Sequence, residues 1–240
     1  MAQELMIVSR DLCFSYPESD HALFSHINFS IDGQGFFSLF GFSGSGKSTL
    51  ARLIGGLLKP DSGSILRSGL EHSLFSYNTE RLPGWITVRE HLEDVAPPGR
   101  SELLLEIVSE LDIVSFMDHK FPRLSMGQKN RVNFARYLLQ DFDLLIADEV
   151  LANVDEPSRT RILAFMKRRY PEKMFIYISH NAREVAVFSK QVLVIPQAGA
   201  NGITGLISLS GMDLDDFGTA DKTLVQNKMI EILQASSRAV

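Results

Sequence analysis

Hydrophobic residues gather in short runs along the first part of the chain, and these runs predict strands. Residues 5–8 form an apolar run, residues 27–31 alternate between apolar and polar, and residues 36–40 are mostly apolar and aromatic. The next apolar positions, within residues 50–58, lie three or four residues apart, which predicts a helix. Turn-forming residues at 59–63 then end this helix.

The second half of the chain continues with helices and then returns to strands. From about residue 87 to residue 140 the apolar spacing is helical, with two interruptions at prolines. Further on, strands are expected at 142–147, 174–178 and 192–195, and helices at 157–169 and 182–188. The first of these strands is nearly all apolar, as a strand buried on both faces must be. Strands that alternate with helices predict parallel βαβ units and an α/β fold.

A change in pattern after about Pro196 predicts a C-terminal appendage. A glycine-rich loop is followed by an acidic cluster at 213–216 and by a helix over 222–236. We therefore expect a main domain over residues 1–197, with a helical insert at about 79–140, and an appendage of a short strand, an acidic loop and a helix over 198–240.

The composition is that of a globular protein and limits the possible functions. Among 240 residues, 45% are hydrophobic and 22% are charged, which excludes a disordered, collagen-like or coiled-coil chain. The 24 basic and 29 acidic residues give a net charge of −5, which disfavours broad nucleic-acid binding. The single cysteine, Cys13, excludes an internal disulfide and favours a reducing compartment. Neither a signal peptide nor a membrane span is indicated, so we expect a soluble chain.

A glycine-rich motif between the strand at 36–40 and the helix that follows predicts a nucleotide site. Residues 41–48 fit G-x-x-x-x-G-K-[ST], and glycines there let backbone N–H groups surround phosphates. Lys47 is expected to neutralise the β- and γ-phosphates, and the hydroxyl of Ser48 to hold Mg²⁺. The residues predicted to bind the nucleotide here are Gly41, Ser43, Gly44, Ser45, Gly46, Lys47, Ser48 and Thr49.

The strand at 142–147 leads into two carboxylates that predict hydrolysis of the nucleotide. Asp148, at the tip of the strand, can reach Mg²⁺ directly or through water, and Glu149 can orient or deprotonate an attacking water. Taken alone, Asp-Glu after an apolar run is more often a solvated strand end. Its combination with the phosphate loop makes hydrolysis the better interpretation.

Five motifs in order resemble those of ABC-transporter ATPase subunits, between about residues 5 and 197. Residues 124–128, Leu-Ser-Met-Gly-Gln, look like the family's signature motif, and His180 follows a strand as the family's switch histidine does. Tyr16 resembles the aromatic residue that stacks on adenine, and Asp155 falls at the position of the D-loop aspartate. The resemblance implies a P-loop NTPase fold: a RecA-like core with a mostly parallel sheet, an N-terminal antiparallel β-subdomain and the α-helical insert.

The signature motif fits a site that two subunits share. Ser125, Gly127 and Gln128 open a predicted helix whose free N–H groups and dipole can face an anion. In the family, two subunits pack head to tail, and each signature closes on the γ-phosphate held by the other. Without the other motifs, residues 124–128 would be read as a plain serine-capped helix. The resemblance therefore implies ATP and Mg²⁺ as ligands, and a second ATPase subunit, identical or related, as a partner.

The chain also departs from the family pattern. Asn78 stands where a catalytic and metal-contacting glutamine is expected, at the end of the second strand of a β-hairpin. Ala152 replaces the usual serine of the D-loop, Val150 replaces a common proline, and Met126 replaces the first signature glycine. The expected catalytic residues Lys47, Glu149 and His180, and the expected metal ligands Ser48 and Asp148, are all retained. We therefore expect an active ATPase.

The absence of a membrane span implies that transport would need separate membrane-spanning permease subunits. Free-standing ATPase chains of this size resemble those of bacterial importers, which can also use a solute-binding protein, and imply a cytoplasmic position on the inner face of the membrane. Residues 81–90 resemble a stretch of the nitrate, sulfonate and taurine importer ATPases, which suggests a small-anion importer. The single tryptophan, Trp85, either faces a membrane subunit or packs internally.

Other classes stay open as alternatives: the ATPase of a bacterial exporter or lipid transporter, or a soluble ABC ATPase acting on nucleic acid or ribosomes. DNA-acting members insert long coiled coils between the two phosphate motifs, and translation-factor members carry two cassettes. Here about 100 residues separate Lys47 from Asp148, one cassette is present, and the charge is acidic. We expect no nucleic-acid partner.

Overall fold

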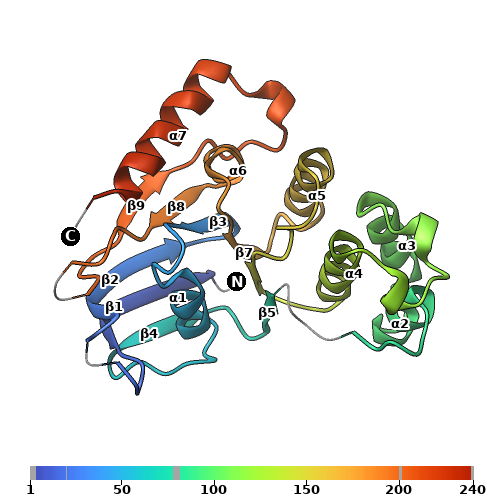
Figure 1. The fold of residues 1–240 in the computed structure, drawn as a ribbon, viewed down its shortest axis with the longest axis horizontal. Helices are drawn as coiled ribbons and strands as arrows, with labels where there is room; N and C mark the ends of the chain where they lie inside the picture. The colour runs from blue at the N-terminus through green and yellow to red at the C-terminus, as the bar shows by residue number, and fades with distance from the viewer. Residues whose placement is uncertain (1–3, 20, 78–81, 200–201, 239–240) are drawn as a thin grey trace.

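The computed structural model describes residues 4–19, 21–77, 82–199 and 202–238 (Figure 1). The strands are β1 (Met6–Phe14), β2 (Phe24–Asp32), β3 (Gly35–Phe40), β4 (Ser62–Ser68), β5 (Ser73–Tyr77), β6 (Leu144–Asp148), β7 (Met174–Ile178), β8 (Gln191–Val194) and β9 (Ile207–Ser210). The helices are α1 (Lys47–Ile54), α2 (Val88–Val95), α3 (Ser101–Glu110), α4 (Met126–Leu138), α5 (Glu156–Arg169), α6 (Ala182–Phe188) and α7 (Lys222–Ser236). Short 3-10 turns lie at η1 (Val114–Phe116), η2 (Phe121–Arg123) and η3 (Phe217–Thr219).

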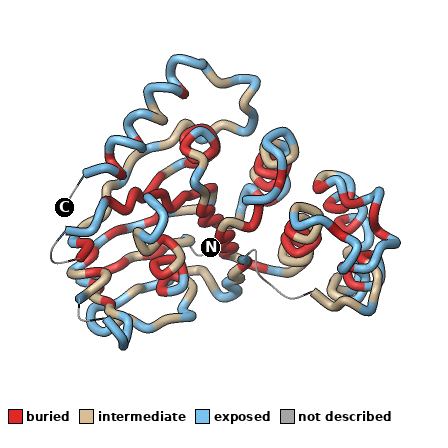
Figure 2. The backbone as a smooth tube through the Cα atoms, viewed as in Figure 1, coloured by how far each residue is buried: buried red, intermediate tan, exposed pale blue. Residues whose placement is uncertain are grey.

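The central sheet has six strands in the order β5-β6-β7-β3-β8-β9. All neighbours pair in parallel except β8 and β9, which are antiparallel. Every residue of β6 and β7 is buried, as the uniformly apolar sequence of each predicts (Figure 2). The α/β fold with a mostly parallel sheet is therefore confirmed.

A second, antiparallel sheet of three strands, β2-β1-β4, lies beside α1 (Figure 1). Along β2, apolar Ile27, Phe29 and Ile31 are buried while the residues between them are exposed, which confirms the predicted alternation. These side chains join those of α1 and one face of the central sheet in a single apolar cluster. The antiparallel sheet and the central sheet thus enclose α1, and α1 carries the end of the glycine-rich motif.

The region between β5 and β6 contains helices α2, α3 and α4, as the helical spacing in the sequence predicts. Thr87 caps α2: its hydroxyl accepts the Glu90 N–H at 3.2 Å, and a Glu90 carboxylate oxygen accepts the Thr87 N–H at 2.7 Å. Helices α2, α3 and α4 share a large apolar cluster with α5 and the second face of the central sheet. Trp85, just before α2, is 76% exposed, so it does not pack internally.

One expectation about Asn78 is wrong. The strand that precedes it, β5, is not the second strand of a β-hairpin, because β5 pairs in parallel with β6 while β4 pairs with β1. β5 is therefore an edge strand of the central sheet. Asn78 itself lies outside the described residues.

The C-terminal segment contains a strand, an acidic loop and a helix. β9 extends the central sheet, and α7 packs against α6 (Figure 1). Lys167 of α5 ties the loop to the core, since its Nζ donates to Asp213 Oδ1 at 2.7 Å and to the carbonyls of Phe188 and Leu214 at 3.0 Å. Whether residues 198–240 form a separate unit stays a prediction. Across the described ranges, no helix combines the length and apolarity needed to cross a bilayer.

Burial of His91 in α2 predicts a specific pH dependence of stability. Burial lowers the pKa of His91, and the nearby Asp94 only opposes this shift. The unfolded chain therefore binds a proton near pH 6.5 that the folded chain does not, so the free energy of unfolding falls as the pH drops below about 6.5. Phenylalanine can keep the edge-to-face contact with Phe121. Replacing His91 with Phe should reduce the loss of stability between pH 7.5 and 5.5 by up to about 1 kcal/mol.

Urea unfolding at the two pH values measures this loss. Exposed His119, replaced by Phe, provides the control for loss of an imidazole at the surface. An equal pH dependence in the wild type and His91→Phe would contradict the prediction.

Candidate active site

The glycine-rich loop joins β3 to α1, and its conformation needs glycine at two positions. Gly44 and Gly46 have φ values of 79° and 89°, in the left-handed region. A Cβ at Gly46 would also lie 2.9 Å from the ring of Phe24. The loop therefore turns tightly and leaves the first N–H groups of α1 facing outward, the arrangement that binds phosphate in loops of this kind.

Lys47, the first residue of α1, lies in this loop and is only 5% exposed. Its Nζ donates to the carbonyls of Gly41 and Phe42, both at 2.9 Å. Burial lowers the pKa of Lys47, while the negative charges of Glu149 and Asp148 raise it. The ammonium group is thus held beside the loop, together with the two carboxylates predicted to act with it.

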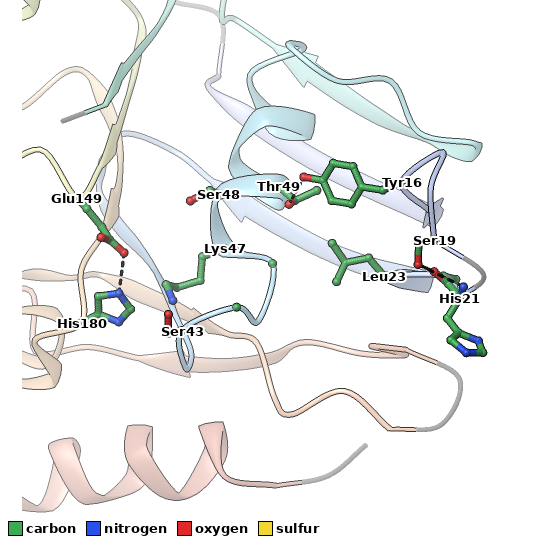
Figure 3. Close-up of a pocket in the computed structure, with 13 residues that line it drawn as sticks. Tyr16, Ser19, His21, Leu23, Ser43, Lys47, Ser48, Thr49, Glu149 and His180 are labelled. Atoms are coloured by element: carbon green, nitrogen blue, oxygen red, sulfur yellow. Dashed lines mark hydrogen bonds and ion pairs between the residues drawn. The ribbon is translucent and has the colours of Figure 1, made fainter. Parts of the chain in front are cut away.

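A cavity of about 460 Å³ opens over the loop (Figure 3). At one end lies Tyr16, whose hydroxyl is 2.8 Å from Thr49 Oγ1, and at the other end lie Glu149 and His180. The predicted residues that line the cavity are Tyr16, Ser43, Gly44, Gly46, Lys47, Ser48, Thr49, Glu149 and His180. Gly41 and Ser45 do not line the cavity and instead lie close together: an added Cβ at Gly41 would be 2.6 Å from Ser45 Oγ.

Asp148 and Ser48 form an oxygen-rich pair near Lys47. Burial raises the pKa of Asp148, and a hydrogen bond with the Ser48 hydroxyl lowers it. A carboxylate and a hydroxyl are oxygen ligands of the kind that Mg²⁺ prefers. No cluster of three or more His, Cys, Asp or Glu side chains that could hold a metal occurs among the described residues. By ligand chemistry, the two oxygens of this pair fit an ion that also takes ligands from phosphate and water, as Mg²⁺ does.

Glu149 and His180 come together from the ends of β6 and β7. His180 Nε2 lies 2.6 Å from Glu149 Oε1 (Figure 3). The Glu149 N–H donates to the carbonyl of Ile178 at 3.2 Å, and Glu149 has a φ of 51°, which is rare for a residue with a side chain. Left-handed backbone outside glycine is frequent at functional sites. Here it turns the carboxylate toward the cavity.

The signature residues form a second group, outside the cavity. Ser125 caps α4 with Gln128: the Ser125 hydroxyl accepts the Gln128 N–H at 3.2 Å, and Gln128 Oε1 accepts the Ser125 N–H at 2.9 Å. A Cβ at Gly127 would lie 2.3 Å from the Asn153 carbonyl oxygen, so α4 begins against the segment that follows Glu149. Asp155 caps α5, accepting the Ser158 N–H at 3.0 Å, and this bond lowers the pKa of Asp155. None of these four residues lines the cavity.

Sequence reasoning missed a buried network around Glu184, in α6. Glu184 is 1% exposed, and its carboxylate binds Arg159 at 2.6 Å. It also accepts hydrogen bonds from Tyr177, Ser179 and Asn181, at 3.0, 3.2 and 2.9 Å. Burial, and then the charge of Glu184, raise the pKa of Tyr177. Because Ser179 and Asn181 flank His180, the network fixes the backbone that carries this histidine. In the sequence, the only indication of this network was an asparagine followed three residues later by a glutamate at the start of a predicted helix, the pattern of a helix cap.

Removal of the Glu184 carboxylate should be strongly destabilising. Ala at this position leaves Arg159 without its carboxylate partner, and breaking such a buried pair costs about 3–5 kcal/mol. The exposed pair Glu156–Arg183, at 2.9 Å, is a matched control, and Glu156→Ala should cost less than about 1 kcal/mol. Urea unfolding compares the two variants, and similar small losses for both would show that the buried network does not hold this region.

Comparison with known proteins supports the reading of these motifs. A family described as "ABC transporter" matches residues 24–152. The molybdenum import ATP-binding protein ModC of Rhizobium etli is 35% identical over 182 residues, which cover 67% of this chain and 51% of that protein. The energy-coupling factor transporter ATP-binding protein EcfA1 of Bacillus licheniformis is 30% identical, over 78% of this chain and 74% of that protein.

A third relative and a solved structure extend the comparison. The spermidine/putrescine import ATP-binding protein PotA of Protochlamydia amoebophila is 29% identical, over 83% of this chain and 58% of that protein. The chain thus spans little more than half the length of ModC and PotA. The structure of a bacterial Atm1-family ABC exporter with ATP bound matches 95% of this chain and 42% of that chain, with a TM-score of 0.75 and 20% identity, which shows a shared fold.

Proposed function

The chain belongs to the ABC transporter family, and from this membership we propose that it is an ATP-binding, ATP-hydrolysing subunit that powers solute transport. The observation that carries the proposal is the meeting of Lys47, Glu149 and His180 at one cavity, from the ends of three neighbouring strands. A phosphate-binding loop alone would suit many nucleotide-binding proteins. A carboxylate held by a histidine beside the loop supplies the base that hydrolysis needs.

The chemistry follows from the positions of these groups. Loop N–H groups and Lys47 bind the phosphates and stabilise the charge that develops on them. Glu149 orients a water and takes its proton as the water oxygen bonds to the γ-phosphorus and the bond to the β–γ bridging oxygen breaks. His180, 2.6 Å from Glu149, holds this carboxylate in place. Tyr16, at the far end of the cavity, provides a face for the base.

Ser48 and Asp148 would hold Mg²⁺, which, when bound, neutralises phosphate charge. The Ser48 hydroxyl and the buried Asp148 carboxylate are suited to this because both are oxygen ligands beside the loop. Asn78, outside the described residues, is proposed as a further contact to the metal or the water, as the sequence suggests.

The signature group acts, in this proposal, on the nucleotide of a second copy or a related chain. Ser125 and Gly127 open α4, a helix of 13 residues, and the cavity of the same chain does not include them. A helix N-terminus stabilises an anion placed against it. Gln128 and Asp155 cap α4 and α5, and these caps fix the backbone at the two helix starts that would face the phosphate bound by the partner chain. Closure on ATP and opening after hydrolysis would then drive membrane-spanning permease subunits.

The finer proposal is a small-anion importer at the inner face of the membrane. The relatives ModC and PotA are named for import, and residues 81–90 suggest the nitrate, sulfonate and taurine class. Exposed Trp85, at the entry to the helical insert, is suited to contact a membrane subunit. For an importer, a solute-binding protein outside the membrane would deliver the anion.

Replacement of Glu149 with Gln should abolish turnover without abolishing binding. The amide keeps the shape of the side chain but cannot accept the water's proton, so kcat for ATP hydrolysis should fall by about 10²–10⁴-fold. The Kd for Mg·ATP should change little, because Lys47 and the loop are intact. Phosphate release and equilibrium binding give the two numbers, with exposed Glu156→Gln as the control. Turnover near the wild-type rate would contradict the role of Glu149.

Replacement of Trp85 with Ala should weaken binding to the permease subunits without changing ATP hydrolysis. The exposed indole makes little contact within the chain, so the free energy of unfolding and the ATPase rate of the isolated protein should be unchanged. Co-purification with its proposed permease subunits should weaken by about tenfold or more, as for loss of an interface anchor. Exposed Leu57, just after α1, is the control. Equal recovery with both variants would exclude Trp85 as an interface residue.

A further inference from the structure

The connection between β8 and β9 is unusually long. The two strands pair with Val194 opposite Ile207, so residues 195–206 make a hairpin connection where two to five residues are usual. Residues 195–199 and 202–206 of it are described. A long connection without regular structure in a compact domain is often functional. The described residues of this connection contact both the start of the phosphate-binding loop and the segment that enters β2.

The connection begins against the phosphate-binding loop. The Ile195 N–H donates to the carbonyl of Phe40, the last residue of β3, at 2.7 Å. A Cβ at Gly41 would lie 2.8 Å from the Ile195 carbonyl oxygen and 3.3 Å from its Cβ. Ile195 is fully buried in the same apolar cluster as α1. The first residue of the connection therefore supports the start of the loop from behind.

Further along, the connection contacts the residues that lead into β2. The Ile203 N–H donates to the Leu23 carbonyl at 3.0 Å, and the Ile203 carbonyl accepts the Ser25 N–H at 2.9 Å, forming a short parallel bridge. Ile203 is 0% exposed. At Gly202, with φ of +78°, an added Cβ would lie 2.2 Å from the Ala22 carbonyl oxygen. Only glycine fits this close approach.

Part of this bridged segment forms the wall of the cavity beside Tyr16. Ala22 and Leu23 line the cavity, and Figure 3 shows Leu23 near Tyr16, at the end away from Glu149 and His180. This wall also touches the loop, because a Cβ at Gly46 would lie 3.2 Å from Leu23 Cδ2. β2 is an edge strand of its sheet. The hydrogen bonds with Ile203 therefore pair backbone groups of Leu23 and Ser25 that no neighbouring strand of that sheet pairs.

We propose that the described residues 195–199 and 202–203 are a positioning segment of the nucleotide site, with Ile195, Gly202 and Ile203 as its contacts. The segment holds the wall at Ala22 and Leu23 at a fixed separation from the phosphate loop, and so sets the length of the cavity that receives base, ribose and phosphates. The proposal rests on the proposed ATP-binding function. Preorganisation of this kind increases affinity by removing the cost of ordering the wall on binding.

The wall that the segment holds lies beside Tyr16, where the base is expected to bind. Disturbing the segment should therefore weaken the binding of ATP more than the binding of a ligand that has phosphates alone. In Gly202→Ala, the added methyl group pushes the segment away from Ala22. We expect the Kd and KM for Mg·ATP to rise about tenfold, which corresponds to 1.4 kcal/mol. The Kd for inorganic tripolyphosphate and the kcat at saturating ATP should stay within about twofold, because the loop and Glu149 are unchanged.

The matched control is Gly205→Ala, three residues further along the same connection. A Cβ there meets nothing within 4 Å, and ATP affinity should be unchanged. If Gly202→Ala does not fold, as judged by circular dichroism, Ile203→Ala removes the buried side chain and keeps the backbone bridge. The same selective rise in the Kd for ATP is expected.

Unchanged ATP affinity in the folded variant would overturn the proposal. So would an equal loss for ATP and tripolyphosphate, which indicates a general weakening of the fold. Failure of the wild-type protein itself to bind ATP would instead contradict the proposed function.

Discussion

The register of β3, β6 and β7 is the constraint on which the candidate site depends. Leu39 of β3 and Asp148 of β6 both pair with Ile178 of β7, so the three strands end level at one edge of the sheet. The segments that follow them carry Lys47, Glu149 and His180. Hydrogen bonds between buried strands, which have few alternative partners, thus fix a lysine, a carboxylate and an imidazole that are far apart in sequence. A shift of one strand by one residue would turn every buried side chain of that strand to the other face.

The same geometry explains why the residues of the five motifs fall into two groups. Residues after β3, β6 and β7 line the cavity together with Tyr16, which follows β1, whereas Ser125, Gly127 and Asp155 lie at the starts of α4 and α5. The groups are connected, because Gly127 packs against the carbonyl of Asn153, four residues beyond Glu149. A short, tightly packed segment thus joins Glu149 to the signature surface. The proposed site shared by two chains would need a connection of this kind.

The sequence predicts the features that are local in the chain. The phosphate loop, the buried strands β6 and β7, and helices α6 and α7 follow from spacing within ten or so residues, and the structure has them where expected. β4 and β5 have few buried residues, so no apolar pattern marks them, and β5 was assigned to the wrong pairing. The Glu184 network and the contacts of Ile203 with Leu23 join distant segments, and no periodicity records such contacts. Exposure of Trp85 likewise depends on how its neighbours pack.

If each chain holds half of a nucleotide site, as we propose, ATP should join two chains. Native mass spectrometry of the Glu149→Gln protein, with Mg·ATP and separately with Mg·ADP, measures this. We expect a species of twice the mass of one chain with two bound ATP molecules, and a single chain with ADP. A protein that binds ATP in every copy yet keeps the mass of one chain would contradict this proposal.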